Sequence, residues 1–300
     1  MRKYSVVVVA STLAVVVAGC GAAEPANKDT SGEPALGQVS TLKETFDLVL
    51  PLDAFRATAE QEATINTAND MLIQECMRRF GFERPVAKRP ITREPNRRYG
   101  ISASDDYPNW GYHPSPEQFV DGKNAPENKY KPSDAEWEVI TGSGSAVVEG
   151  EKVPEGGCLG EAGRALDLYQ GGATSRTAVD DFVQKLTVES NVAARADSRV
   201  LAAWSAWSTC MDEAGFDYAT PWDANDDEDW WTEQTPTEDE ITTAEADVAC
   251  KEKSNTIGIN LAVEAAYQDR LVERNAETLN DLRTRLATRV KRATEIASGN

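Results

Sequence analysis

The sequence contains a single histidine, His113, among its 300 residues. A zinc site that needs two histidines, such as the His-Glu-x2-His helix, is therefore excluded. The sequence also has no Gly-x-Ser-x-Gly nucleophile elbow and no Gly-Lys-Ser or Gly-Lys-Thr phosphate loop. A lone histidine in a loop is more often a hydrogen-bonded structural residue than a general base. We therefore expect no catalytic residue and no cofactor, and we favour a non-enzymatic protein.

Basic residues are also few. The chain has 31 Lys and Arg against 50 Asp and Glu, which gives a formal net charge of −19. This charge repels the phosphates of nucleic acids and of anionic lipids, so nucleic acid is not an expected partner. Between Val200 and Cys250 there is no Lys or Arg at all, whereas fourteen acids occur there. This segment should carry an uncompensated negative field.

A long apolar run occurs only at the start of the chain. Arg2 and Lys3 precede an almost wholly apolar stretch from Ser5 to Val17. This stretch is shorter than the roughly 20 residues that a membrane-spanning helix needs, and it is typical of a signal-peptide core. The small residues Ala18 and Gly19 then stand directly before Cys20.

The run Val17-Ala18-Gly19-Cys20 resembles the lipobox of bacterial lipoproteins. The resemblance implies that residues 1–19 are a signal peptide and that Cys20, modified with diacylglycerol and palmitate, is the mature N-terminus. We expect attachment to the extracytoplasmic face of the cell membrane, because two or more acyl chains give stable binding. Residues 20–40 are rich in Ala, Gly, Pro and Ser, and we expect them to form a lipidated disordered tether.

Cysteine is scarce too, with five in the chain and no Cys-x2-Cys pair that would favour zinc. If Cys20 is lipidated, four remain, and four cysteines in an exported chain imply two disulfides with three conceivable pairings. Cys76–Phe82 and Cys210–Phe216 share the pattern Cys-Met-x3-Gly-Phe, and a further cysteine follows each copy. From this repeated order we predict the bonds Cys76–Cys158 and Cys210–Cys250.

Both copies of the pattern should end a helix. Glycine commonly follows the last helical turn in a left-handed conformation, and the next residue then packs back on that turn. We expect Gly81 and Gly215 in the first role and Phe82 and Phe216 in the second. The paired motif is similar to uncharacterised lipoproteins of high-GC Gram-positive bacteria, a resemblance that brings no known activity with it.

Apolar residues at intervals of three and four predict a mainly α fold, a bundle of two disulfide-linked helical units. The first unit would span residues 41–173 and the second residues 174–300. A Pro- and aromatic-rich loop should cover 83–132, and Glu136–Glu149 suggests a small β-hairpin with a glycine turn. Thr237-Glu238-Asp239-Glu240 predicts a capping box, and one last helix should run from about Ile259 to Ala297. That helix either lies along the bundle, which we favour, or pairs with a partner.

The acidic segment 217–233 is the expected recognition surface, because tryptophans stand among its acids. A basic envelope protein or a cation could bind there, and the residues that we expect to take part are Trp222, Asp223, Asp227, Asp229, Trp230 and Trp231. Alternatively, the tryptophans fold back onto Trp204 and Trp207, or the basic end of the last helix, 283–292, neutralises the segment. The spacing of acids from Asp223 matches a calcium loop only in part, because Glu228 replaces the turn glycine and Gln234 the final glutamate, so the metal remains unknown.

Two functions follow from these patterns. We favour a membrane-anchored, extracytoplasmic lipoprotein of binding or structural type. The alternative is a carboxylate-dependent hydrolase acting on cell-wall material, since paired carboxylates can hydrolyse glycosides and fifty acids are present.

Overall fold

The computed structural model describes residues 32–86, 95–115, 130–168 and 178–299. Contacts divide the chain into residues 1–32 and 33–300, and every element below belongs to the second part. The expected signal peptide, Cys20 and most of the tether lie outside the described residues. No helix in the described part is long and apolar enough to cross a membrane.

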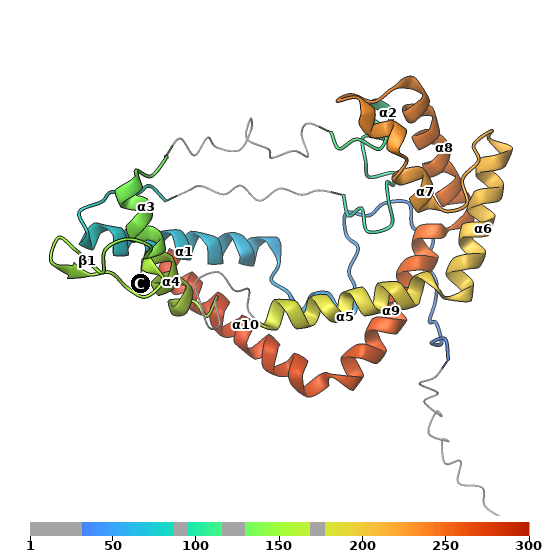
Figure 1. Ribbon diagram of the computed structural model, residues 1–300. Helices are drawn as coiled ribbons and strands as arrows, with labels where there is room; N and C mark the ends of the chain where they lie inside the picture. The colour runs from blue at the N-terminus through green and yellow to red at the C-terminus, as the bar shows by residue number, and fades with distance from the viewer. Residues whose placement is uncertain (1–31, 87–94, 116–129, 169–177, 300) are drawn as a thin grey trace, which may run out of the picture. The chain divides into compact units, whose positions relative to one another are not determined.

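The described residues are mainly helical, as the sequence predicts, and one short antiparallel β-hairpin accompanies the helices (Figure 1). The α-helices are α1 (Ala59–Arg79), α2 (Tyr107–Trp110), α3 (Asp134–Thr141), α4 (Gly157–Ala165), α5 (Ala178–Arg195), α6 (Ser198–Glu213), α7 (Pro221–Asn225), α8 (Glu238–Ser254), α9 (Thr256–Arg274) and α10 (Ala276–Ala297). Two 3-10 helices, η1 (Pro51–Phe55) and η2 (Glu228–Thr232), and the strands β1 (Val147–Val148) and β2 (Glu151–Lys152) complete the set.

The two Cys-Met-x3-Gly-Phe motifs end their helices in the same way. Gly81 after α1 and Gly215 after α6 have φ angles of +76° and +95°, in the left-handed region that glycine adopts at little cost. The amide of Phe82 donates to the Met77 carbonyl, and the amide of Phe216 donates to the Met211 carbonyl. These bonds define a Schellman motif, in which the residue after the glycine packs back on the last turn. The expectation from sequence is confirmed at both sites.

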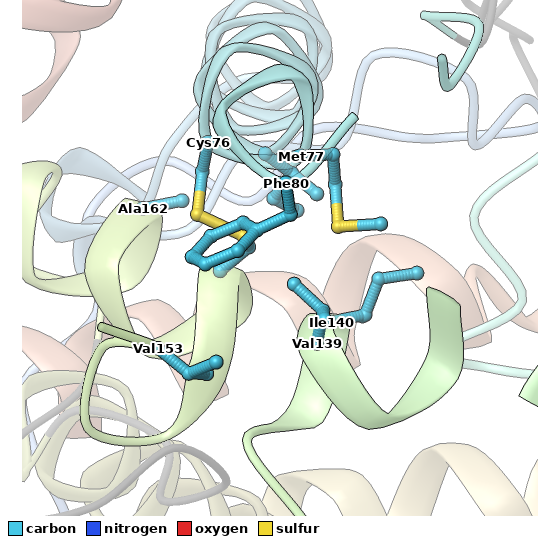
Figure 2. Packing of buried hydrophobic residues seen from close by; sticks show 9 residues of the cluster. Cys76, Met77, Phe80, Val139, Ile140, Val153 and Ala162 are labelled. Atoms are coloured by element: carbon cyan, nitrogen blue, oxygen red, sulfur yellow. A yellow bond between two sulfur atoms is a disulfide. The ribbon is translucent and has the colours of Figure 1, made fainter. Parts of the chain in front are cut away.

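Both predicted disulfides are present, and they are sequential. Cys76 bonds Cys158 at the start of α4, and Cys210 bonds Cys250 in α8, each with a Cα–Cα distance of 5.6 Å. Each bond lies within a cluster of buried apolar side chains. Figure 2 shows the first cluster, where Phe80 and the Cys76 sulfur lie between α1 and the segment that carries Val153 and Ala162. The disulfides therefore join helices across the middle of two separate apolar cores.

The helical units are packed on one another. α10 packs along α1, α5 packs on α9, and η1 lies against α5, α9 and α10. Ile101 and Tyr112, from the long loop after α1, belong to the cluster around Cys210 and Cys250. The last helix therefore lies along its own chain, as we favour from the sequence.

The predicted hairpin is wrong in its first strand. Residues 134–141 form α3, because Ser133 accepts the Glu136 amide and the Glu136 carboxylate accepts the Ser133 amide. This reciprocal capping box starts a helix, and the helix ends at Gly142. The hairpin itself is present but displaced, pairing Val147 with Lys152 and Val148 with Glu151.

The predicted single last helix is also wrong, because it is two helices. Asn275 leaves the helical conformation with φ −116° and ψ 21°, and its side-chain amide donates to the Leu271 carbonyl. Figure 1 shows the change of direction between α9 and α10 at this point. The start of α9 is likewise earlier than expected: Gly258 lies inside the helix, where a Cβ would collide with the Ser40 carbonyl oxygen.

The end of the predicted tether is bound to the helices. Glu33 accepts hydrogen bonds from the amide and hydroxyl of Ser198, the first residue of α6. Arg199 donates to the Pro34 carbonyl, and Leu36 packs near Trp204. The chain is therefore held against α6 from Glu33 onward.

Candidate functional site

The acidic segment 217–233 is folded into two short helices, α7 and η2. Thr220 caps α7 by accepting the Asp223 amide, and the Asp223 carboxylate accepts the Thr220 amide in return. Asp227 caps η2 by accepting the Asp229 amide, and it also accepts the Tyr218 hydroxyl at 2.8 Å. Burial of that hydroxyl, with Asp227 beside it, raises the pKa of Tyr218. Two of the acids chosen as recognition residues, Asp223 and Asp227, therefore also hold the segment in shape.

Trp230 points into the protein. Its side chain is 8% exposed, its ring stacks on Tyr112 with 5.9 Å between centroids, and its indole N–H donates to the Ala224 carbonyl. It belongs to the same buried cluster as Trp207 and the Cys210–Cys250 bond. Trp230 is thus a packing residue, as the alternative of inward-folded tryptophans describes.

Trp222 also contacts the helices. It is half-buried in the cluster of Trp204 and Val200, and the Arg195 guanidinium lies 5.0 Å from its ring centroid. The same guanidinium lies 5.6 Å from the Trp204 ring. One cation therefore sits between two indoles, an arrangement that ties α7 to the end of α5.

Trp231 differs from its neighbour, since 51% of its side chain is exposed. Its inner face lies against the His113 ring, 4.9 Å between centroids. His113 is itself buried, and its Nδ1 lies 2.8 Å from a carboxylate oxygen of Glu240. That oxygen also accepts hydrogen bonds from the amides of Tyr112 and His113. The predicted capping box is therefore only half formed: Thr237 accepts the Glu240 amide, but the Glu240 carboxylate bonds to the loop instead of to Thr237. His113 has the hydrogen-bonded structural role expected of it.

We call the exposed part of this segment the acidic surface. It comprises Trp231 together with the exposed acids Asp217, Asp223, Asp226, Glu228, Asp229 and Glu233. The basic end of the last helix does not neutralise it through any ion pair described: Arg285 pairs with Asp167 beside α4 instead. Within the described residues no three His, Cys, Asp or Glu side chains are placed to hold a metal ion together.

A buried polar network lies beneath this surface, and sequence reasoning missed it. On α8, Asp247 accepts hydrogen bonds from Lys251 Nζ at 2.8 Å, Trp207 Nε1 at 2.9 Å and the Tyr112 hydroxyl at 3.2 Å. Lys251 donates also to the Ile101 carbonyl. Burial raises the pKa of Asp247, an effect that Lys251 opposes, and burial also raises the pKa of Tyr112.

A second group of buried charges anchors the same loop to α9. Glu264 is fully buried and accepts the Tyr99 hydroxyl at 2.8 Å and Arg98 Nε at 2.8 Å. Arg97 donates to Asp105 at 2.6 Å and to the Tyr112 carbonyl at 2.8 Å. Residues 97–113 are therefore held on α9 by the Arg98–Glu264 ion pair and on α8 by hydrogen bonds, and they form the platform on which Trp230 and Trp231 rest.

Comparisons of the chain with models of protein families, with curated proteins and with solved structures return no match. The acidic surface must therefore be judged on its own geometry. That geometry offers exposed carboxylates and one exposed indole on a base held by hydrogen bonds and an ion pair.

Proposed function

We propose that this protein is a membrane-anchored, extracytoplasmic lipoprotein that binds another component of the cell envelope and has no enzymatic activity of its own. The observation that supports a compartment outside the cytoplasm is the pair of disulfides, because such bonds persist in oxidising environments. They occupy all four cysteines after Cys20, which leaves the lipobox cysteine for acylation.

The acidic surface is the proposed binding site. Its acids stand in a stretch of fifty-one residues, 200–250, without a single Lys or Arg, and Trp231 adds a large exposed ring. A basic segment of an envelope protein fits this combination, because opposite charge speeds encounter and a cation can lie on the indole face. The ion-paired platform under Trp231 keeps the site preformed, which reduces the entropy lost on binding.

The hydrolase alternative finds no supporting geometry in the described residues. Three of the buried acids, Asp247, Glu240 and Glu264, are engaged with Lys251, His113 and Arg98, and none of the three lines the cavity described below. We therefore keep binding as the proposal.

The proposal is tested by titrating the protein with a lysine-rich peptide while the fluorescence of its tryptophans is recorded. The variant Glu228→Gln/Asp229→Asn should weaken binding about tenfold or more, since it removes two charges beside Trp231. The matched control is Glu277→Gln/Asp281→Asn, which removes two exposed charges from α10 and should bind as wild type does. Equal weakening in both variants would mean that only net charge matters, and it would refute a specific site.

The tryptophans separate binding from folding. Trp231→Ala should lose binding with little change in melting temperature, because the ring is half exposed. Trp230→Ala should unfold at clearly lower temperature, since truncating a buried tryptophan costs about 3–5 kcal/mol. Unchanged peptide affinity in Trp231→Ala would contradict the proposed role of the exposed indole.

A further inference from the structure

A cavity of about 150 Å³ lies between the end of α4 and one face of α10. Its walls are Ala165, Leu166 and Asp167 on one side and Thr284, Arg285, Thr288, Arg289 and Arg292 on the other. The α10 residues are spaced by one and three positions, so they share one face of the helix. In a chain with a net charge of −19, three arginines around one cavity are a local reversal of sign.

Asp167 is the only acid among the described residues of the lining, and it bonds to two of the arginines. Its carboxylate accepts a hydrogen bond from Arg285 Nη2 at 2.8 Å, and its carbonyl accepts one from Arg289 Nη2 at 2.7 Å. Asp167 has φ +51°, the left-handed conformation, at the position after α4 where glycine would be more comfortable. An aspartate at this position costs backbone energy, and its use is consistent with a functional demand on the cavity.

Arg289 is the unusual group. Its side chain is buried, with 8% exposure, yet among the described residues its acceptor is the Asp167 carbonyl and its buried Nε–H has no hydrogen-bond partner. A guanidinium stays protonated in proteins, so within the described part of the chain this charge is buried without a carboxylate of its own. An uncompensated buried charge is costly, and a bound anion would remove that cost.

Arg292 stands one turn further along at the mouth of the cavity, where it is exposed and pairs with no carboxylate among the described residues. Asp167 compensates one of the three arginines, so the lining keeps two positive charges. Ala165 and Leu166 add apolar wall. One side of the site thus presents guanidinium groups that can donate to several oxygens of one anion, and the other side is small and apolar.

We propose that this cavity binds a phosphate group, in which Arg289 and Arg292 contact the phosphate oxygens and Arg285 is held ready by Asp167. Guanidinium groups pair with phosphate through two parallel hydrogen bonds, and they are preferred where planar recognition of such oxygens matters. The site is separate from the acidic surface, and the proposal does not depend on the function assigned to that surface.

The test is calorimetric titration of the folded protein with two probes, glycerol 1-phosphate and a soluble short-chain phosphatidylglycerol. Saturable binding of the first identifies a free phosphate monoester as the source, and saturable binding of the second identifies a lipid headgroup. Either result supports the proposal. Binding of neither probe by the wild-type protein overturns it.

Three variants make the test specific to the cavity. Arg292→Ala should weaken binding about tenfold or more, because it removes a charge from the mouth of the site. Arg283→Ala, an exposed arginine of α10 that bonds Asn280 and does not line the cavity, should leave binding unchanged. Asp167→Asn should tighten binding, since asparagine tolerates the left-handed conformation while one opposing charge is lost.

The sign of the Asp167→Asn effect is decisive. If the only role of Asp167 is to hold the end of α4 against α10, the variant should lower the melting temperature and leave phosphate affinity unchanged or weaker. That outcome, or equal losses in Arg292→Ala and Arg283→Ala, would overturn the proposed site.

Discussion

Lys251 and Asp247 face each other one helical turn apart on α8, with 2.8 Å between Nζ and Oδ2 and with both side chains enclosed. Because Trp207, Tyr112 and the Ile101 carbonyl bond to the same pair, this ion pair connects α6, α8 and the loop 97–113. The pair lies next to Tyr112, the platform residue on which Trp230 stacks.

Removing one partner of this pair should be strongly destabilising. Lys251→Met leaves the Asp247 charge buried without its counter-ion, and we expect a loss of about 3–5 kcal/mol in the free energy of unfolding. The double variant Asp247→Leu/Lys251→Met should cost less than the sum of the single variants, since no unpaired charge remains. Urea denaturation measures all three, and additive losses would show that the pair is not coupled.

Gly81 and Gly215, which follow α1 and α6, allow the energetic cost of a left-handed backbone to be measured apart from any steric clash. A Cβ at Gly81 or Gly215 would meet no atom within 4 Å, so the whole cost of alanine there comes from the left-handed backbone. We expect each alanine variant to lose about 1 kcal/mol. Gly37→Ala, which is equally free of contact but lacks a left-handed φ, should be neutral. A comparable loss in this control would remove the backbone explanation.

The disulfides close loops of 82 and 40 residues in sequence separation. In the loop-entropy model such loops stabilise the folded state by about 4.5 and about 3.9 kcal/mol. Replacing Cys76 and Cys158 with serine should therefore cost at least as much as replacing Cys210 and Cys250. Thermal unfolding of the two double variants gives the order, and a clearly larger loss for the second pair would show that local packing outweighs loop length.

Asp197 should make the stability of the folded protein depend on pH. Burial alone would raise its pKa, but hydrogen bonds from Arg199, together with that residue's charge, hold the pKa below the ordinary 3.8. The stability that Asp197 contributes is therefore present above about pH 4, and it is lost as the pH falls through the lower folded pKa. Asp197→Asn should reduce stability at pH 7 and flatten this acid limb. Parallel acid-denaturation curves for variant and wild type would contradict the assignment.

Local signals made part of the structure predictable. The two helix ends were predictable because each depends on a few neighbouring residues, the glycine above all. The two disulfides were predictable from the repeated order of the cysteines, although each bond joins distant residues. A helix forms at 134–141 although Trp137, Val139 and Ile140 favour a strand, because Ser133 caps a helix start. The bend at Asn275 was missed because no Pro or Gly marks it.

Tertiary contacts were not predictable in the same way. Trp230 and Trp231 are adjacent in sequence, and only the fold shows that the first stacks on Tyr112 while the second remains half exposed. Glu264 pairs with Arg98, which is 166 residues away in the sequence, and no periodic pattern predicts such a contact. The sequence therefore located the acidic surface but not the ion-paired platform beneath it.

The central claim, a lipid-anchored protein outside the cytoplasm, is tested most directly by the mass of the mature N-terminal peptide from purified membranes. The account predicts a peptide that begins at Cys20 and carries diacylglycerol, and it predicts that Cys20→Ala leaves the precursor unprocessed while both disulfides still form. A membrane-free wild-type protein, or a mature N-terminus at any other residue without lipid, would contradict it.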